Sequence, residues 1–239
     1  MIDLTCLSGD GVKALDNVSF DAYAGEILGI AGIAGSGQKE LCETIAGLYP
    51  SVGGSVLYSE SSEKGAVKER ILGLSPDEIA KKGISMAFVP EDRLGMGLVA
   101  GMDMTDNVML RSYKSNKGIF VDRKSPRDLA EKLIKELEIV TPGVETPVGR
   151  LSGGNVQKVL LGREIACQPS VLIVAYPVRG LDINASYRIY VLMQLSDRIM
   201  VMCGGKVSGI VDPRKVTKEE IGLMMIRTEQ DGEKEEVTE

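Results

Sequence analysis

The 239 residues of this chain include no histidine, and only 4% of them are aromatic. The absence of histidine excludes a histidine general base and a histidine metal ligand. The formal net charge is −6, and no basic stretch with interleaved aromatic residues occurs. Proteins that bind nucleic acid carry such basic surfaces, so nucleic acid is not an expected partner.

Cysteines and long apolar segments are scarce as well. The four cysteines stand singly within apolar or helical sequence, which favours reduced thiols over a disulfide framework or a zinc site. No apolar run reaches the roughly 18 residues that a membrane helix needs. The first residues lack the basic and apolar regions of a signal peptide. We therefore expect any membrane role to be exercised through a partner.

The stretch 26–48 changes from a strand pattern to a helix pattern across a glycine-rich loop. Residues 27–31 are mostly apolar without alternation, as in a strand covered on both faces, and apolar residues recur at helical spacing from Leu41. Between these segments lie Gly32, Gly35 and Gly37. Glycine lets the backbone turn tightly and approach a ligand, and the amides that follow stand at a helix N-terminus, which favours an anion.

The loop is close to the phosphate-binding pattern G-x-x-x-x-G-K-[ST], with Gly32 and Gly37 as its two glycines. It differs at both reactive positions, because Gln38 replaces the lysine that binds phosphate and Lys39 replaces the hydroxyl that binds Mg²⁺. Taken alone, the loop is also compatible with a tight strand-to-helix turn in another kind of α/β protein.

Patterns on the C-terminal and N-terminal sides of this loop predict further elements. Residues 1–24 alternate loosely, which predicts antiparallel strands, and 51–58 predicts another strand. The polar stretch 59–70 is expected to be a surface insertion. A Ser-Pro-Asp-Glu sequence that begins at Ser75 is a capping box and predicts a helix to about Lys82.

A strand and a helical region come next. Residues 84–89 predict an apolar strand, and 104–140 has a helical pattern in which a half-buried helix starts near Ser125. The stretch 141–150 contains two prolines and two glycines, so it is predicted to be a loop.

Residues 151–155 read Leu-Ser-Gly-Gly-Asn and precede an apolar helix that extends to Ala166. They resemble the LSGGQ-type signature of ATP-binding cassette (ABC) proteins. The surrounding motifs occur in the order typical of that family. They are the phosphate loop, a Q-loop-like Pro-Glu-Asp-Arg at 90–93, the helical region, the signature, a Walker B-like strand at 171–175 and a D-loop-like Gly-Leu-Asp at 180–182.

This resemblance covers nearly all of residues 1–226 and implies an α/β fold, a P-loop NTPase of ABC type. We expect a mixed sheet with helices on both faces, an N-terminal antiparallel β flank and an inserted helical lobe at about 102–165. One nucleotide-binding domain would span 1–226, and the acidic tail 227–239 is expected to be disordered.

A finer resemblance is to the second of two tandem cassettes in importers of simple sugars and nucleosides. It is carried by the sequences VPEDR at 89–93, GMGLV at 95–99, TPG at 141–143 and PVRGLD at 177–182, and by Asn155 and Lys158. The TPG and LGMG sequences resemble the nucleoside importers of that subgroup. Because the full subunit would hold two cassettes, we expect this chain to be a trimmed part of it.

The resemblance assigns nucleotide-binding roles to ten positions, and the implied cofactor is ATP. They are Gly32, Gly35, Ser36, Gly37, Gln38, Lys39 and Glu40 in the phosphate loop, and Ser152, Gly153 and Gly154 in the signature. The family's catalytic positions are occupied by Glu91 in the Q-loop, Tyr176 in Walker B and Asp182 in the D-loop. Glu91 can also be interpreted as a solvated turn carboxylate.

ATP hydrolysis in this fold needs a lysine for the phosphates, ligands for Mg²⁺ and a group that orients water. Gln38 carries no charge, and Ala175 and Tyr176 stand where the family has Asp and Glu. Alanine holds no metal, and tyrosine, with an ordinary pKa of about 10, is a poor base near neutral pH. We assign no catalytic residue and no metal ligand here, and we expect weak or no hydrolysis by this chain alone.

Lys39 has two interpretations. In one, its ammonium replaces the charge of Mg²⁺, so that nucleotide binds without metal. In the other, it is a solvated residue in the first turn of the helix.

The switch histidine of the family is missing, and so is room for its strand. Only 183–194 separate the D-loop from 195–198, which resembles the next family segment. A helix of about 11 residues and a strand of about 5 do not fit there. Either the chain is deleted at this point or the sequence omits residues.

The signature acts in trans in this family, against the γ-phosphate held by the opposite cassette. Ser152, Gly153 and Gly154 are intact for that role. The resemblance therefore implies an asymmetric pair, in which this chain completes the site of a second ABC cassette. Transmembrane permease subunits are the other implied partners, and the implied location is cytoplasmic, peripheral to the inner face of the membrane.

Two other functions compete with this one. A structural or regulatory pseudo-ATPase would bind no nucleotide. A soluble ABC protein of translation or DNA repair is disfavoured by the acidic charge and the lack of a coiled-coil insertion.

No adenine-stacking aromatic is evident, since Tyr23 lies very close to the loop, and Val12 or Lys13 is the alternative cover for the base.

Overall fold

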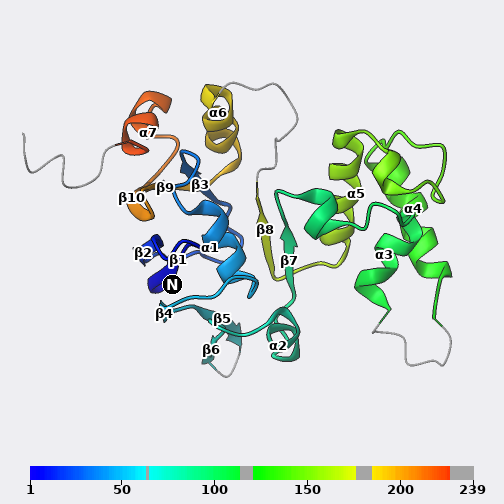
Figure 1. The fold of residues 1–239 in the computed structure, drawn as a ribbon, viewed down its shortest axis with the longest axis horizontal. Coiled ribbons are helices and arrows are strands. Elements are labelled where there is room, and N and C mark those ends of the chain that lie inside the picture. The colour runs from blue at the N-terminus through cyan, green and yellow to red at the C-terminus, as the bar shows by residue number, and fades with distance from the viewer. Residues whose placement is uncertain (63–64, 114–120, 176–184, 227–239) are drawn as a thin grey trace, which may run out of the picture. The chain divides into compact units, whose positions relative to one another are not determined.

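The computed structural model describes residues 1–62, 65–113, 121–175 and 185–226. Predictions for Tyr176, for the D-loop with Asp182 and for the acidic tail 227–239 lie outside these ranges. The chain forms two compact units, one from residues 1–79 and 182–239 and the other from residues 80–181 (Figure 1). No helix in the described ranges is both long enough and apolar enough to cross a membrane.

The first unit begins with the antiparallel flank that the sequence predicts. Strand β1 (Ile2–Leu7) lies between β2 (Lys13–Val18) and β4 (Gly53–Ser55) and is antiparallel to both. The segment expected to be a surface insertion is more regular than predicted. Its residues form most of an antiparallel hairpin of β5 (Leu57–Ser62) and β6 (Gly65–Arg70).

A second sheet in the same unit carries the phosphate loop. Strand β3 (Leu28–Gly32) is parallel to β9 (Arg198–Cys203), which is antiparallel to β10 (Lys206–Val211). Successive side chains of a strand point to opposite faces. Met200 and Met202 accordingly pack with Leu41, whereas Ile199 and Val201 pack with Ile221.

Helices cover both faces of this second sheet, as predicted. Leu41 belongs to α1 (Gln38–Ile45), and Ile221 belongs to α7 (Lys218–Met224), which packs beside α6 (Ala185–Leu195) (Figure 1). Helix α6 ends three residues before β9 begins, so no strand fits between them. The predicted lack of room for a strand at this point is therefore confirmed for the described residues.

The predicted capping box is present at α2 (Pro76–Lys81), next to the boundary between the units. The Ser75 amide donates to Glu78 Oε2 at 2.8 Å, and the Glu78 amide donates to Ser75 Oγ at 3.4 Å. Local sequence alone fixes this helix start, because both orphan amides are satisfied within one turn.

The second unit combines two parallel strands with a group of helices. Strands β7 (Met86–Val89) and β8 (Val171–Val174) pair in register, and the helices are α3 (Met104–Ser112), α4 (Lys124–Glu136) and α5 (Gly153–Ala166). Two short turns, η1 (Arg93–Gly97) and η2 (Val148–Arg150), lie between them. The predicted helix near Ser125 and the signature helix to Ala166 are both confirmed.

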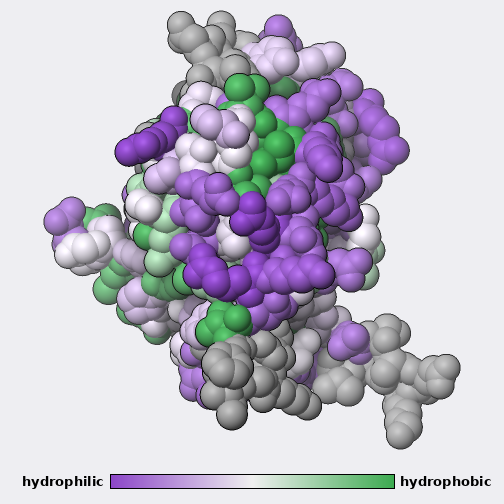
Figure 2. All heavy atoms as spheres, turned by 90° about the vertical axis from the view of Figure 1, so that its right-hand side faces the viewer, coloured by the Kyte–Doolittle hydropathy of each residue, from purple (hydrophilic) through white to green (hydrophobic). Residues whose placement is uncertain are grey.

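The core of the second unit is built from the apolar stripes of these helices. Its buried residues include Leu98, Met104, Ala130, Leu133, Val148, Val159 and Leu160. Helices α4 and α5 approach closely at Gly162, where a Cβ atom would lie 2.6 Å from a Leu137 methyl carbon. Figure 2 shows that hydrophilic side chains cover most of one face of this unit, with apolar side chains gathered in a band.

Candidate functional site

The phosphate loop follows β3 directly and ends at the N-terminus of α1. Gly37 is the N-cap residue with φ 93°, and no side chain caps the helix. A Cβ atom at Gly37 would lie 2.5 Å from the Ala14 carbonyl oxygen, so only glycine fits here. The first amides of α1 have no partner within the helix and are available to an anion.

The structure brings the predicted loop residues together but buries some of them. Gly35 is exposed and has φ 84°, in the left-handed region that glycine tolerates. Ser36 is only 2% exposed, and its amide donates to the Ile33 carbonyl at 3.1 Å. Ser36 therefore shapes the loop from inside, and a ligand would contact chiefly the amides around it.

The side chain of Gln38 lies across the loop. Its Nε2 donates to the Ile33 carbonyl at 3.2 Å. A Cβ atom at Gly32 would lie 2.2 Å from that same nitrogen, so the amide group rests on the glycine backbone. Gln38 thus bridges the start and end of the loop with a neutral hydrogen bond.

Lys39 extends along the helix in this conformation. Its side chain is 60% exposed, and Nζ lies 4.0 Å from Glu43 Oε1, one turn further on. Glu40 is partly buried in the same first turn. This placement agrees with the interpretation of Lys39 as a solvated first-turn residue, and a role near phosphate would require the side chain to leave Glu43.

Glu43 is a carboxyl group with little access to water. Its side chain is 11% exposed, and burial raises its pKa, with Lys39 acting in the opposite direction and Glu40 in the same direction. A raised pKa means that the folded state holds this proton more tightly than the unfolded state. Its ionisation therefore costs folding free energy as the pH rises above the unfolded pKa of about 4.3.

A Glu43→Gln variant is accordingly expected to be more stable than the wild type at pH 7, with a melting temperature higher by about 2 °C. The ion pair with Lys39 is long, at 4.0 Å, and its lysine is exposed, so it offsets little of this gain. Melting followed by circular dichroism at pH 7 and at pH 4 tests this. The difference should shrink at pH 4, where the unfolded carboxyl is largely protonated, and a less stable variant at pH 7 would contradict the assignment.

Tyr23 is engaged away from the phosphate loop. The Arg198 guanidinium lies 5.3 Å from the centre of the Tyr23 ring and pairs with Glu26 at 3.0 Å. Tyr23 precedes the first residue of β3, whereas the loop follows the last one. The ring therefore stacks on an arginine at the other end of the strand.

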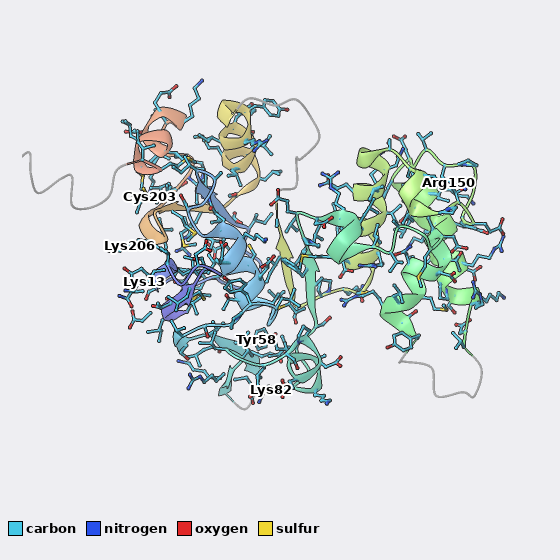
Figure 3. The ribbon with its side chains drawn as sticks, viewed as in Figure 1. Lys13, Tyr58, Lys82, Arg150, Cys203 and Lys206 are labelled. Atoms are coloured by element: carbon cyan, nitrogen blue, oxygen red, sulfur yellow. The ribbon has the colours of Figure 1, made fainter. Side chains whose placement is uncertain are left out.

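Of the two other residues considered as cover for the base, Lys13 begins β2 and Val12 directly precedes it. Lys13 Nζ pairs with Asp16 at 2.6 Å, and Lys206 adds a second contact at 3.6 Å (Figure 3). The hydrogen bond from Lys13 is the main cause of the lowered pKa of Asp16. Val12 is 67% exposed. The Ala14 carbonyl lies against the loop at Gly37, so both candidate residues are within two positions of this contact.

The signature lies in the second unit, at the start of α5. Ser152 is the N-cap residue, and its Oγ accepts hydrogen bonds from the Asn155 amide at 3.4 Å and from Asn155 Nδ2 at 3.0 Å. Ser152, Gly153 and Gly154 are exposed. A Cβ atom at Gly154 would meet nothing within 4 Å. The structure thus presents a capped helix start and small residues to solvent.

The segment after α4 supports the signature from one side. Asn155 Oδ1 accepts from the Val140 amide at 3.0 Å, and Lys158 Nζ donates to the Glu138 carbonyl at 3.0 Å. Glu138 has φ 50°, an uncommon conformation for a residue other than glycine. Asn155 and Lys158 carried the finer family resemblance, and their contacts show what these two residue types do here.

Our sequence analysis missed a buried polar network that includes residues of the signature helix. Asn107 is fully buried, and its side chain makes four hydrogen bonds to the backbone of Val99, Met102 and Asp103. Arg163 is 6% exposed, pairs with Glu164 at 2.7 Å and donates to the Gly97 carbonyl at 2.8 Å. Two adjacent opposite charges on an apolar helix were the available signal.

The remaining predicted positions lie in or after short strands. Glu91 is partly buried just after β7, and Arg93 Nη1 donates to the Gly153 carbonyl at 2.9 Å. The Ala175 amide continues the pairing of β8 by donating to Val89 at 2.8 Å. Only a methyl group stands at Ala175, where a metal ligand would be expected.

Residues 15–177 match the family model described as ABC transporter. The chain belongs to this family. The solved cassette MJ0796, described as dimeric, matches with a TM-score of 0.70 at 21% identity over 90% of this chain and 98% of its own. A second MJ0796 structure, bound to ADP and Pi, gives 0.68 at 20% identity. The predicted P-loop NTPase fold of ABC type is confirmed.

Curated relatives of this cassette are ATP-binding proteins of import systems. The xylose import protein XylG of Moorella thermoacetica is 35% identical over 87% of this chain and 44% of its own length. The guanosine import protein NupO of Bacillus subtilis is 34% identical over 90% and 45%. The galactose/methyl galactoside import protein MglA of Fusobacterium nucleatum is 33% identical over 92% and 47%. The chain spans about half the length of the curated relatives it matches.

Proposed function

We propose that this cassette works as one half of an unequal pair that drives import of a simple sugar or nucleoside. It donates its signature to ATP held by a second ABC cassette, and its own phosphate loop binds ATP weakly and hydrolyses little or none. The observation that carries the proposal is the contrast between the two sites. The signature is exposed and well supported, whereas the phosphate loop is bridged by neutral Gln38.

The signature half of this proposal rests on electrostatics at a helix start. The N-terminus of α5 carries partial positive charge, and the amides of Gly153 and Gly154 have no partner within the helix. Such donors are preorganised for a phosphate and need no rearrangement when charge develops on it. A partner's γ-phosphate would fit against this open surface because no side chain stands in the way at Gly154.

The weak half rests on what the chain's own loop offers. The motifs that bind phosphate and metal are degenerate, since Gln38 is neutral and Ala175 offers no ligand atom. Loss of the lysine and of both Mg²⁺ ligands removes the charges that hydrolysis requires. Any ATP bound here would rely on loop amides and on Lys39, whose ammonium would have to leave Glu43 and take the place of the metal.

We propose transmembrane permease subunits as the other partners, and the import role in the names of the relatives supports this. We assign Glu91 and the turn after it to contact with a transmembrane permease subunit, which places the cassette at the cytoplasmic face of the membrane. The names of the relatives support a sugar or a nucleoside as the transported solute. We further propose that 1–226 is one nucleotide-binding domain with a helical lobe at about 102–165, and that it is the C-terminal cassette of its subunit.

A pseudo-ATPase that binds no nucleotide is the second candidate. The bond from Gln38 to the Ile33 carbonyl favours it, because this bond must break before the glutamine amide can face a phosphate. Under this alternative the signature would be the cassette's remaining contribution to the pair.

Calorimetric titration of ATP into the chain, once with Mg²⁺ and once with EDTA, tests these two candidates. Weak, saturable binding of similar strength in both buffers is the expected result, because Lys39 and loop amides replace the metal. Strong dependence on Mg²⁺ would contradict the role of Lys39. No binding in either buffer would support the pseudo-ATPase instead.

Replacing Gln38 by lysine provides a matched test of the missing charge. A Gln38→Lys variant should bind ATP about tenfold more tightly, because a charged donor to phosphate is roughly twice as strong as a neutral one and the bond to Ile33 no longer competes. The same titration measures this. An affinity equal to that of the wild type would show that the charge at position 38 does not limit binding.

A further inference from the structure

We propose that Arg93 is a positioning residue for the signature, because it holds the Gly153 carbonyl and with it the first turn of α5. The contact itself is independent of the proposed function, but its consequence for ATP hydrolysis rests on that function. Arg93 and Gly153 are 60 positions apart in sequence and both belong to the second unit.

The turn that carries Arg93 is fastened to α5 at two places. At one end, Arg93 Nη1 donates to the Gly153 carbonyl at 2.9 Å, in the first turn of α5. At the other end, Arg163 Nη2, near the C-terminus of α5, donates to the Gly97 carbonyl at 2.8 Å. Asp92 directly precedes the turn and caps it, since its Oδ1 accepts from the Gly95 amide at 2.9 Å. The turn η1 therefore contacts α5 near both ends of the helix.

Helix stability alone does not explain a guanidinium at this place. The N-terminus of α5 is the positive end of its dipole, so a nearby cation costs the helix free energy. The same cation favours an anion that approaches the helix start, where it adds to the field of the amides. Arg93 thus helps the signature to receive a phosphate while it fixes the backbone of Gly153.

Arg93 ties the first turn of α5 to a different segment from the one that Asn155 and Lys158 contact. Asn155 and Lys158 tie this turn to the segment after α4 through the Val140 amide and the Glu138 carbonyl. Arg93 links the first turn of α5 to η1. Removing Arg93 would release one of these two supports and leave the other, so the expected defect is local to the signature.

Small displacements at such a site have large kinetic effects. A misplacement of about 1 Å in a group that positions substrate can lower a rate by about 100-fold. The amides of Gly153 and Gly154 are the groups that Arg93 would hold in place. Loss of Arg93 should therefore lower the rate of hydrolysis more than it lowers the stability of the chain.

Amide hydrogen exchange of the whole chain tests the contact without any assumption about function. In an Arg93→Gln variant, peptides that span 151–158 should exchange at least about tenfold faster, the effect of losing one hydrogen bond to a charged donor. Peptides that span 159–166 should be unchanged. Arg127→Gln is the matched control, because Arg127 pairs only with solvated carboxylates among its described ion pairs. Unchanged exchange at 151–158, or faster exchange throughout the second unit, would overturn the proposal.

The rate of ATP hydrolysis by the importer complex that contains this chain supplies the second readout. Arg93→Gln should lower kcat about tenfold and change KM for ATP by less than about twofold, and Arg93→Lys should restore part of kcat, since lysine can still donate to the carbonyl. If a signature substitution abolishes hydrolysis but Arg93→Gln leaves kcat unchanged, the inference about Arg93 is overturned and the proposed function stands. If the signature substitution has no effect, the proposed function fails, and the exchange experiment still decides on Arg93.

Discussion

A Gly154→Asp variant of this chain is expected to lower ATP hydrolysis by the importer complex by at least about 100-fold, because keeping the phosphate from the signature costs at least as much as losing one donor to a developing negative charge. The new carboxylate would occupy the place where the partner's γ-phosphate meets the signature and would repel it. The chain itself should fold normally, because a Cβ atom at Gly154 meets nothing within 4 Å. A carboxylate in the first turn of a helix also favours the helix. Steady-state phosphate release from the purified complex measures the effect.

Gly143→Asp is the matched control for this variant. A Cβ atom at Gly143 likewise meets nothing within 4 Å, and the residue lies in the same unit but outside the signature. It adds the same charge, so a comparable loss of rate in this control would point to a general electrostatic effect. Gln38→Ala should leave the rate within about twofold, because the chain's own loop is not the hydrolysing site under this account. Full activity of Gly154→Asp would contradict donation of the signature.

An Asn107→Ala variant is expected to destabilise the chain by about 3 kcal/mol, because it leaves several buried backbone groups without partners. The Asn107 side chain accepts from the Val99 amide at 2.8 Å and donates to the carbonyls of Val99, Met102 and Asp103 at 3.1, 3.2 and 2.9 Å. For a chain of this size the corresponding fall in melting temperature is about 6–12 °C. Urea unfolding followed by circular dichroism measures the free energy.

Lys132→Ala on α4 is the control for this measurement. Lys132 is exposed, and its ion pair with Glu136 spans 3.7 Å, so its loss should change the melting temperature by less than about 1 °C. Asn107→Asp should be at least as damaging as Asn107→Ala, since a carboxylate would face three carbonyl oxygens. Equal stability of Asn107→Ala and the wild type would show that water replaces the missing amide.

The sequence predicted the elements that local rules determine. Helix α5 follows from Ser152 as N-cap and an apolar stripe to Ala166, and the α2 capping box is complete within four residues. The covered strand β3 followed from an apolar run without alternation. These predictions hold because each depends on residues that are close together in the chain.

Other features could not be predicted because they depend on contacts distant in sequence or on the choice between rotamers. The polar residues of the β5–β6 hairpin show no hydrophobic alternation, so the pattern of its side chains did not predict the backbone pairing. Gln38 turns back to Ile33 through a rotamer that the motif does not specify. The contact between Arg93 and Gly153 joins residues 60 positions apart. Motif spacing led to the candidate site, and the contacts that support it became visible only in the fold.

The unequal pair is tested most directly by counting ATP molecules hydrolysed in a single turnover of the importer complex that contains this chain. Radiolabelled ATP in excess over the complex, with rapid quenching during the first turnover, gives a product amplitude that equals the number of competent sites per complex. The account predicts one competent site, with the count unchanged by Gln38→Ala and brought to zero by Gly154→Asp. Two competent sites per complex, or one that disappears with Gln38→Ala and survives Gly154→Asp, would contradict it.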